Sequence, residues 1–556
     1  MESERVGLTV ELSLDNWSSR FTTRGVVYLR GYIINLERVV SRLDGLLDAQ
    51  LAQSIESISS IMSDAEGQFG LVYCRDGFVV GACDRIRSHP IVYSDKSGVL
   101  VLSDSAAIFE GWSKSAEVEI DAVASIAMSG CACGDLTLYR GVRNLQAGEF
   151  VVFDRATGSR HVARYYHYRP WLYEHRPYPE QKHRLRDVTL SAIERMVNSI
   201  GGRKVCLGLS AGMDSRLILS ALHKINFKNV LCYSYGLPDN YEVRAARDLC
   251  NQLGYPWVYV PTNHRIMRAM YESSDYQDYL SQVDTFAATP SVHQFHVVGE
   301  LIRSEQVTPE DVFVNGYSGD YITGGHIPRN LTTQGCLDGS SIQDRLRDAI
   351  INKHFSLWRH LKTDNNLKRI GQMILNRFQS AGLDIDAMDD SVAFAYYEWF
   401  EWQHRQTLWS MNQPRVYEYW GHEWRFPLWD RHFVDFWQAT PPEQKLQRKL
   451  LKDMLSEENW AGVWRDVSFP RFNSPRSVAA LRLATKALAI PFGTPFWESI
   501  DRRYFSYHLD ILCLSACVDS SVVRNDTRGY RNAISWLTEI YLGRIHGVDT
   551  SKILLQ

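Results

Sequence analysis

The stretch Leu207-Gly208-Leu209-Ser210-Ala211-Gly212-Met213-Asp214-Ser215-Arg216 decides the fold, because it joins an apolar run to a predicted helix. The run Lys204–Leu209 is typical of a buried parallel strand, and a helix is expected over Asp214–Lys224. Such a junction offers unpaired backbone N–H groups and the positive end of a helix dipole to an anion. Ser210 and Ser215 add hydroxyl donors, and Gly212 is expected to permit a backbone turn that residues with a Cβ avoid. Together these features predict a phosphate-binding turn.

Strands and helices alternate on both sides of this turn. A helix is predicted before it, over Leu185–Ser199, and the segments after it are a strand over Asn229–Tyr235, a helix over Asn240–Leu253, and strands over Trp257–Val260 and Asp311–Asn315. This spacing indicates parallel βαβ units in an α/β domain whose sheet is buried on both faces. From about residue 340 the pattern changes to amphipathic helices rich in Trp and Tyr.

The N-terminal third has another pattern. Its predicted strands are short, β-branched or aromatic, and separated by polar turns: Gly25–Ile34, Gly70–Tyr73, Phe78–Ala82, Val99–Leu102 and Phe150–Phe153. Helices are expected over Leu36–Leu51 and Asp121–Met128. This pattern predicts an α+β domain on a mostly antiparallel sheet. A segment rich in Pro and aromatic residues then marks a boundary, which divides the chain into residues 1–165, a linker 166–183, and residues 184–556.

Composition limits the possible partners. Lys and Arg number 61 and Asp and Glu 64 in 556 residues, so a net charge of −3 gives no overall attraction to nucleic acid or acidic membranes. The first residues are too charged for a signal peptide, and the most apolar helical stretch, 477–492, carries Arg482 and Lys486. The ten cysteines lack zinc-site spacing and are interpreted as reduced thiols. We expect a cytoplasmic protein without a membrane span and without a nucleic-acid partner.

A second strand end also carries an acid. Val312-Phe313-Val314-Asn315-Gly316-Tyr317-Ser318-Gly319-Asp320 is an apolar strand followed by a glycine-rich turn. Because ligands bind at the carboxyl ends of neighbouring parallel strands, Asp214 and Asp320 are predicted to converge on one Mg²⁺. The dipeptide Gly-Lys is absent from the chain, which excludes a Walker-type P-loop.

These motifs resemble those of a known family. The 207–216 string resembles the SGGxDS turn of the ATP pyrophosphatase (PP-loop) superfamily, with Ala211 at the first glycine, and residues 312–326 resemble SGEGSDELFGGY, with Tyr321 in place of an acid. Tyr233–Gly236 resembles the adenine-flanking strand end, Glu423–Asp430 resembles EARxPFLD, and Lys445–Met454 resembles the helix after it. Three N-terminal strings also have counterparts: Gly67–Gly70, Cys83–Tyr93 and Thr137–Val142. In this order they resemble the asparagine synthetase family (class B type) over about residues 25–460.

The resemblance implies a fold and a site. The N-terminal domain is expected to be an Ntn-like β-sandwich of the glutaminase type, and the C-terminal domain a PP-loop synthetase domain with added helices. ATP and Mg²⁺ are the implied cofactors. The implied nucleotide-binding residues are Leu209, Ser210, Gly212, Asp214, Ser215, Tyr235, Asn315 and Gly316, and the implied metal ligands are Asp214 and Asp320.

The N-terminal domain lacks the residues that hydrolyse glutamine in the family. The nucleophile there is a Cys directly after the initiator Met, where this chain has Glu2, and Arg30 stands in place of the Asn of the oxyanion pair. We therefore predict no glutaminase activity. The nitrogen is expected as free ammonia, from a partner protein, or as an amine on a second substrate.

The resemblance implies an amide-forming ligase that activates an acceptor carboxylate as acyl-AMP with release of pyrophosphate. Glu398 is the preferred base for the attacking nitrogen and Glu401 the reserve; the alternative is a solvated acid on an aromatic helix. The family's loop Lys has no counterpart, although Arg465, Arg471 and Arg476 could supply its charge. His293, His296 and His326 are expected to be turn or core histidines.

Several alternatives stay open. The acceptor is a small molecule, a uronic acid of a glycan, or a peptide carboxylate. A homodimer is one option for the oligomeric state. The departures at Ala211 and Tyr321 and the missing Lys also allow a catalytically inactive scaffold. A PP-loop enzyme acting on tRNA is disfavoured by the near-neutral charge.

Overall fold

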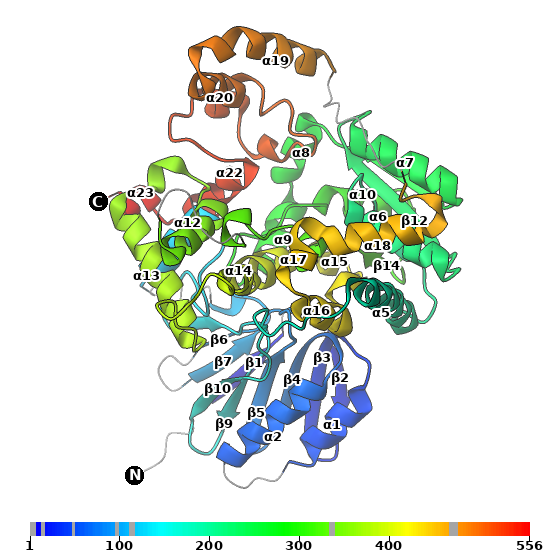
Figure 1. Cartoon of the computed structure of the whole chain (residues 1–556). Coiled ribbons are helices and arrows are strands. Elements are labelled where there is room, and N and C mark those ends of the chain that lie inside the picture. The colour runs from blue at the N-terminus through cyan, green and yellow to red at the C-terminus, as the bar shows by residue number, and fades with distance from the viewer. Residues whose placement is uncertain are drawn as a thin grey trace.

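The computed structural model describes residues 7–12, 17–46, 51–94, 99–109, 117–332, 340–465 and 476–555. Figure 1 shows the N-terminal sheets, in blue to cyan, at one end of the molecule and a lobe made of α19 and α20, in orange, at the other. The parallel-sheet domain lies between them. The predicted division into an antiparallel α+β part and a parallel α/β part is confirmed.

The N-terminal part contains two sheets. The six-stranded sheet has the order β10-β9-β5-β4-β3-β2 and is antiparallel; the four-stranded sheet has the order β1-β7-β6-β8. The strands are β1 Gly7–Glu11, β2 Ser18–Phe21, β3 Gly25–Ile33, β4 Gly67–Arg75, β5 Phe78–Cys83, β6 Val92–Ser94, β7 Val99–Ser103, β8 Val142–Asn144, β9 Glu149–Asp154 and β10 Arg160–Arg164. The helices are α1 Leu36–Asp44, α2 Leu51–Asp64, η1 Ala107–Phe109 and α4 Ile120–Ser129.

The N-terminal part has three layers, because alternate side chains of the larger sheet pack on its two opposite faces. Val72 and Val79 point into the core between the two sheets, together with Tyr93 and Leu102 of the smaller sheet. Their neighbours on the other face of the larger sheet pack against α1 and α2. Since successive strand residues point to opposite faces, a continuous apolar run here means burial on both sides. The predicted β-sandwich is therefore present, with a helical layer on its outer face.

The parallel sheet has the order β13-β12-β11-β14-β15, and every neighbouring pair is parallel. Its strands are β11 Val205–Gly208, β12 Val230–Gly236, β13 Trp257–Pro261, β14 Val312–Val314 and β15 Trp424–Arg425. The first four match the predicted strands, whereas β15 is too short to be recognised from a hydrophobic run. Because β11 and β14 are adjacent, the turns that follow them lie at one edge of the sheet.

Helices fill the remainder of the C-terminal part. They are α5 Tyr178–Ser199, α6 Met213–Lys224, α7 Tyr241–Leu253, α8 His264–Tyr271, α9 Ser274–Val283, α10 Phe295–Arg303, α11 Gly319–Ile322, α12 Ile342–His354, α13 Asp364–Ser380, α14 Ala393–Glu401, α15 Arg415–Tyr419, α16 Arg431–Gln438, α17 Pro442–Lys445, α18 Lys449–Glu458, α19 Arg476–Ala489, α20 Thr494–Tyr504, α21 Ser520–Asn525, α22 Ala533–Ile540 and α23 Thr550–Leu554. A π-helical segment, η4 Trp402–Trp409, continues α14. Shorter one-turn segments are η2 Arg329–Leu331, η3 Arg359–Leu361, η5 Ser410–Asn412, η6 Pro427–Trp429, η7 Leu446–Arg448, η8 Trp460–Gly462, η9 Ile490–Phe492, η10 Leu514–Cys517 and η11 Tyr541–Ile545.

Two predicted helix boundaries are wrong. The helix α5 begins at Tyr178, inside the segment expected to be a linker, because Pro177 and Pro179 fall before and within the first turn, where proline is tolerated. The helix predicted over Leu36–Leu51 ends at Asp44, where Gly45 forms the C-cap, and residues 47–50 lie outside the described ranges.

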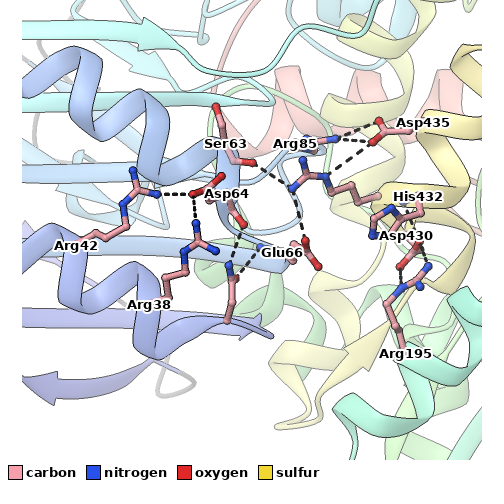
Figure 2. A network of polar contacts seen from close by, with 12 residues as sticks. Arg38, Arg42, Ser63, Asp64, Glu66, Arg85, Arg195, Asp430, His432 and Asp435 are labelled. Atoms are coloured by element: carbon pink, nitrogen blue, oxygen red, sulfur yellow. Dashed lines mark hydrogen bonds and ion pairs between the residues drawn. The ribbon is translucent and has the colours of Figure 1, made fainter.

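Polar contacts join the two domains near α2 and α16. Figure 2 shows Arg85 of the N-terminal domain facing Asp435, with Nη1 to Oδ1 at 3.1 Å. The pair of Arg195 and Asp430 at 2.6 Å, also drawn there, lies within the C-terminal part. Arg431 donates to the carbonyl of Ser63 at 3.2 Å. These side chains are partly exposed, so they orient the domains more than they stabilise them.

Two expectations about the whole chain can be examined in the described residues. None of the helices described is long and apolar enough to cross a membrane. The nine cysteines in the described ranges are all free thiols, as predicted, and Cys336 lies outside those ranges.

Candidate functional site

The turn between β11 and α6 is held by hydrogen bonds from its backbone N–H groups to its own serine hydroxyls. Ser210 N–H donates to the hydroxyl of Ser215 at 3.2 Å, and Gly212 N–H donates to Ser210 Oγ at 3.1 Å. The expectation for Gly212 is wrong: its φ of −68° and ψ of 161° are open to any residue. A Cβ there would meet only Ser210 Oγ at 3.1 Å, the end of a small side chain.

Glycine is required in the second turn instead. A Cβ on Gly316 would stand 2.9 Å from Cβ of Asp214, and one on Gly319 would stand 2.7 Å from Oδ1 of Asp214. Such distances are too short for carbon atoms, so only glycine lets the turn after β14 approach the start of α6. This close approach brings Asp214 and Asp320 to the same place.

The two turns line one cavity of about 270 Å³. Every predicted nucleotide and metal residue lies on its wall: Leu209, Ser210, Gly212, Asp214, Ser215, Tyr235, Asn315, Gly316 and Asp320. The wall also includes Gly208, Ser234, Glu242, Gln294, Tyr317, Ser318 and Leu512. A larger cavity of about 530 Å³ lies between α9 and the C-terminal helices, but no phosphate-binding turn contributes to it.

The two carboxylates have unlike electrostatic surroundings. Burial raises the pKa of Asp214 to about 6, and the neighbouring Asp320 adds to this, while the Arg448 guanidinium, which donates to Oδ1 of Asp214, opposes it. Burial would also raise the pKa of Asp320, but the hydrogen bond and charge of His326 hold it at about 2. One carboxylate is therefore balanced by an arginine and the other by a histidine.

These residues fit a divalent cation that is shared with a ligand. Among the described residues no group of three or more His, Cys, Asp or Glu side chains is arranged to hold a metal ion. Mg²⁺, however, is commonly bound by one or two carboxylates together with substrate phosphates and waters. Asp214 and Asp320 beside the predicted phosphate-binding turn are such a donor set, and the charge of Arg448 already lies against one of them.

Glu398 and Glu401 do not line this cavity. Both are buried on α14, so neither is a solvated surface acid. Glu398 Oε2 accepts from Lys445 Nζ at 2.6 Å, and the backbone carbonyl of Glu398 accepts from the hydroxyl of Tyr321 at 2.7 Å. Glu401 Oε1 is bound by Nδ1 of His326 and by Nε2 of Gln406 at 2.9 Å.

His326 joins Glu401 to the cavity. Its Nε2 lies 2.9 Å from Oδ2 of Asp320, while its Nδ1 faces Glu401. Burial alone would lower the pKa of His326, but Glu401 and Asp320 raise it to about 10, which favours the charged imidazole between the two carboxylates. His326 lies in the turn after α11, as expected, and its two ring nitrogens also link Glu401 to Asp320. Burial lowers the pKa of both His293, to about 4, and His296, as expected of core histidines.

Sequence reasoning missed His326 and Arg448. His326 ends the glycine-rich string Gly324-Gly325-His326, so its position near Asp320 was a usable signal. Arg448 lies within the segment Lys445–Met454, and its left-handed backbone, with φ of 64°, turns it toward Asp214. Of the arginines considered for the missing Lys, Arg465 is exposed and does not line the cavity, whereas Arg471 and the side chain of Arg476 lie outside the part of the chain that the structure describes.

The segment Ile511–Leu514, here called the strap, forms another side of the cavity. The carbonyl of Ile511 accepts from Leu237 N–H at 2.8 Å, just past the end of β12, and Leu512 lines the cavity. Tyr271, on α8, donates from its hydroxyl to the carbonyl of Leu514 at 3.0 Å. The strap thus fixes one wall of the site across more than two hundred residues of sequence.

Residues 184–457 match the family model described as Asparagine synthase. The chain carries an asparagine synthase domain over these residues. The match includes both acid-bearing turns, α14 and Arg448 of the site, and excludes the strap and the N-terminal domain. The resemblance of the N-terminal strings therefore stays a prediction.

Solved structures give distant similarities. An NH3-dependent NAD synthetase from Campylobacter jejuni is 15% identical, with a TM-score of 0.21, over 40% of this chain and 93% of its own. A glutamine phosphoribosylpyrophosphate amidotransferase from B. subtilis is 12% identical, with a TM-score of 0.16, over 55% of this chain and 58% of its own. An allosteric regulatory enzyme of purine biosynthesis is 11% identical, with a TM-score of 0.17; the match covers 44% of this chain and 61% of that protein's length. No curated protein matches the chain.

A buried charge cluster joins the N-terminal domain to the asparagine synthase domain. Arg30 pairs with Asp104 at 2.6 Å and with Glu418, on α15, at 2.7 Å. Glu418 also lies 2.9 Å from Nδ1 of His89 and 3.4 Å from Nε of Arg415. These five residues, the interdomain charge cluster, are all buried. Arg30 thus spans the domain boundary at the position where the resemblance has the oxyanion Asn; Glu2 lies outside the described residues.

Proposed function

We propose that this protein is an ATP-dependent amide-forming ligase that activates an acceptor carboxylate as acyl-AMP and releases pyrophosphate. The observation that carries the proposal is that the phosphate-binding turn, Asp214 and Asp320 line one cavity. The asparagine synthase domain supports an ATP-using ligase in general terms. Formation of the acyl-AMP, use of Mg²⁺ and a cytoplasmic location belong to the proposal.

Each part of the cavity has a task in this reaction. The N–H groups at the start of α6 and the hydroxyls of Ser210 and Ser215 bind the departing phosphates. Asp214 and Asp320 would hold Mg²⁺, which, when bound, neutralises negative charge that develops on the leaving group. Arg448 would leave Asp214 when a cation binds that carboxylate, because the two positive charges repel each other. Its guanidinium would then bind the phosphates.

The nitrogen nucleophile arrives as ammonia or an amine and not from glutamine hydrolysis in this chain. Glu2 replaces the family's nucleophilic Cys, and Arg30 is fully engaged with Asp104 and Glu418. Glu398 is our candidate for the base that accepts the amine proton. Because Glu398 is buried and does not line the cavity, its bond with Lys445 has to loosen and its carboxylate has to reach the cavity. Glu401 is instead linked to Asp320 through His326.

Exchange of labelled pyrophosphate into ATP tests the first half of the reaction. Aspartate, glucuronate and a panel of peptide carboxylates would be supplied with Mg²⁺. With an accepted acid, Asp214→Asn is expected to reduce exchange about 100-fold or more, because it removes one charge opposite the reacting phosphates. Asp248→Asn is the matched control, since Asp248 is a well-exposed acid on α7.

Two results would count against the proposal. Undiminished exchange in Asp214→Asn would refute the site. Tight binding of ATP and Mg²⁺ in calorimetry without exchange for any acid would favour the catalytically inactive scaffold.

A further inference from the structure

The α19–α20 lobe, residues 476–504, concentrates exposed apolar side chains. Seven of the sixteen large hydrophobic residues exposed in the described ranges lie on it: Leu481, Leu483, Leu488, Ile490, Phe492, Phe496 and Tyr504, each with 49% to 75% of its surface exposed. Scattered exposed hydrophobic residues are normal, but a contiguous group marks an interaction site. The same stretch contains the apolar segment 477–492 that the proposed reaction does not use.

The inward face of α19 has polar and apolar partners on and near α20, and further apolar residues lie on its outward face. Arg482 pairs with Asp501 on α20 through two hydrogen bonds, and Ala489, Trp497 and Phe505 form a small core of their own. Leu481, Ala484 and Leu488, at spacings of three and four, therefore share the solvent side. A helix that is apolar on both faces is normally covered on both.

The lobe stands apart from the molecule's other surfaces. In Figure 1 it projects at the end opposite the N-terminal sheets. Phe492 and Phe496 lie at the junction of the two helices, with ring centroids 5.6 Å apart. Phe492 and Phe496 therefore lie together on a projecting part of the molecule.

Charge distinguishes between possible occupants. The lobe carries Arg476, Arg482, Lys486, Arg502 and Arg503 against Glu498 and Asp501, which is a net charge of 5 − 2 = +3 on a chain of net −3. The helix α19 contains no acidic residue. Two copies of the lobe would repel each other, whereas an anionic surface would attract it. Basic residues beside exposed Leu, Phe and Tyr are the composition of segments that lie in a bilayer interface.

We propose that the α19–α20 lobe docks the protein on an anionic membrane surface. Leu481, Leu488, Phe492 and Phe496 enter the boundary of the acyl chains, and Lys486 and Arg503 remain at the headgroups. The inference goes beyond the proposed ligase reaction and does not depend on it.

Flotation of the full-length protein with vesicles tests this. The probes are phosphatidylcholine vesicles with and without 30 mol% phosphatidylglycerol. The wild type is expected to float with the anionic vesicles, and less so at high salt, because salt screens the basic residues. Leu488→Glu/Phe492→Glu is expected to lower binding about 10-fold or more, since it places two acids on the lobe. Leu172→Glu is the matched control, because Leu172 is a comparably exposed leucine outside the lobe.

The positions changed are exposed, so unaltered melting of the variants separates lost docking from lost folding. Lys486→Glu/Arg503→Glu is expected to remove the preference for anionic vesicles. Wild-type protein that stays with the aqueous fraction in both cases would overturn the proposal. So would a dimer in light scattering that the Leu488→Glu/Phe492→Glu variant dissociates, because a second copy would then cover the lobe.

Discussion

Replacing Glu418 by Gln tests the interdomain charge cluster. In the folded protein Arg30 and Arg415 are balanced by Asp104 and Glu418, and the His89 imidazole is buried beside them. The variant keeps the shape of the side chain but leaves two buried guanidinium groups facing one carboxylate. Breaking a buried pair by removing one partner costs about 3–5 kcal/mol, because the remaining charge is uncompensated.

This cost should appear in the melting temperature. At roughly 2–4 °C per kcal/mol for a unit of 150–250 residues, Glu418→Gln is expected to melt roughly 6–20 °C below the wild type. Tryptophan fluorescence is a suitable probe, since Trp17 donates to Asp104 and Trp424 donates to Glu418, each at 3.0 Å. The matched control is Arg20→Met, which breaks an exposed pair with Glu37 and is expected to change little.

A second variant and the pH dependence of melting test the interdomain charge cluster further. Arg30→Met/Glu418→Gln restores the charge balance and is expected to melt above Glu418→Gln alone. Burial would raise the pKa of Glu418, but Arg30, Arg415 and His89 hold it below its usual value. Its stabilisation is therefore complete above a pH of about 4.3 and is lost as pH falls further, so the gap to Glu418→Gln narrows in acid. Equal melting of wild type and Glu418→Gln at pH 7 would refute the account.

Three further predictions concern the cavity at the ends of β11 and β14 and the N-terminal domain. Gly316→Ala is expected to weaken binding of ATP with Mg²⁺ in calorimetry more than Gly212→Ala, because only the first places a Cβ 2.9 Å from Asp214; equal effects would contradict the close approach of the turns. His326, with a pKa raised to about 10, stabilises the fold fully below a pH of about 6.5 and loses this as pH rises through 10, so His326→Gln should melt with a flatter dependence between pH 7 and 10, and parallel curves would argue against the charged link. The purified wild type should release no glutamate from glutamine, and measurable release would show that another residue replaces the missing nucleophile.

The central part of the fold and site could be predicted from sequence because it is local. Strand β11, its turn and α6 are continuous in the chain, and parallel pairing alone brings the ends of β11 and β14 together. Asp214 and Asp320 could therefore be paired without knowing any side-chain contact. Buried strands and periodic helices depend likewise on patterns within a few residues.

The rest depends on contacts that no local pattern encodes. Arg448 reaches Asp214 across 234 residues, and Arg30 reaches Glu418 in the other domain. The two-residue strand β15 is recognisable only from its pairing with β14. Gly212 shows a different limit, because a glycine in a motif does not reveal its backbone dihedral angles. Gly316, on the wall of the same cavity, is the position where a Cβ would be too close to Asp214.

The bond between Ile511 and Leu237 has a practical consequence for dividing the protein. The asparagine synthase domain ends by similarity at residue 457, yet Leu512 completes the cavity wall. A fragment that ends at that boundary would lack the part of the cavity wall formed by Leu512. The Leu237 amide would also lose its hydrogen-bond acceptor, the carbonyl of Ile511. A fragment that keeps the whole cavity wall must therefore extend beyond the matched residues, at least as far as Leu512.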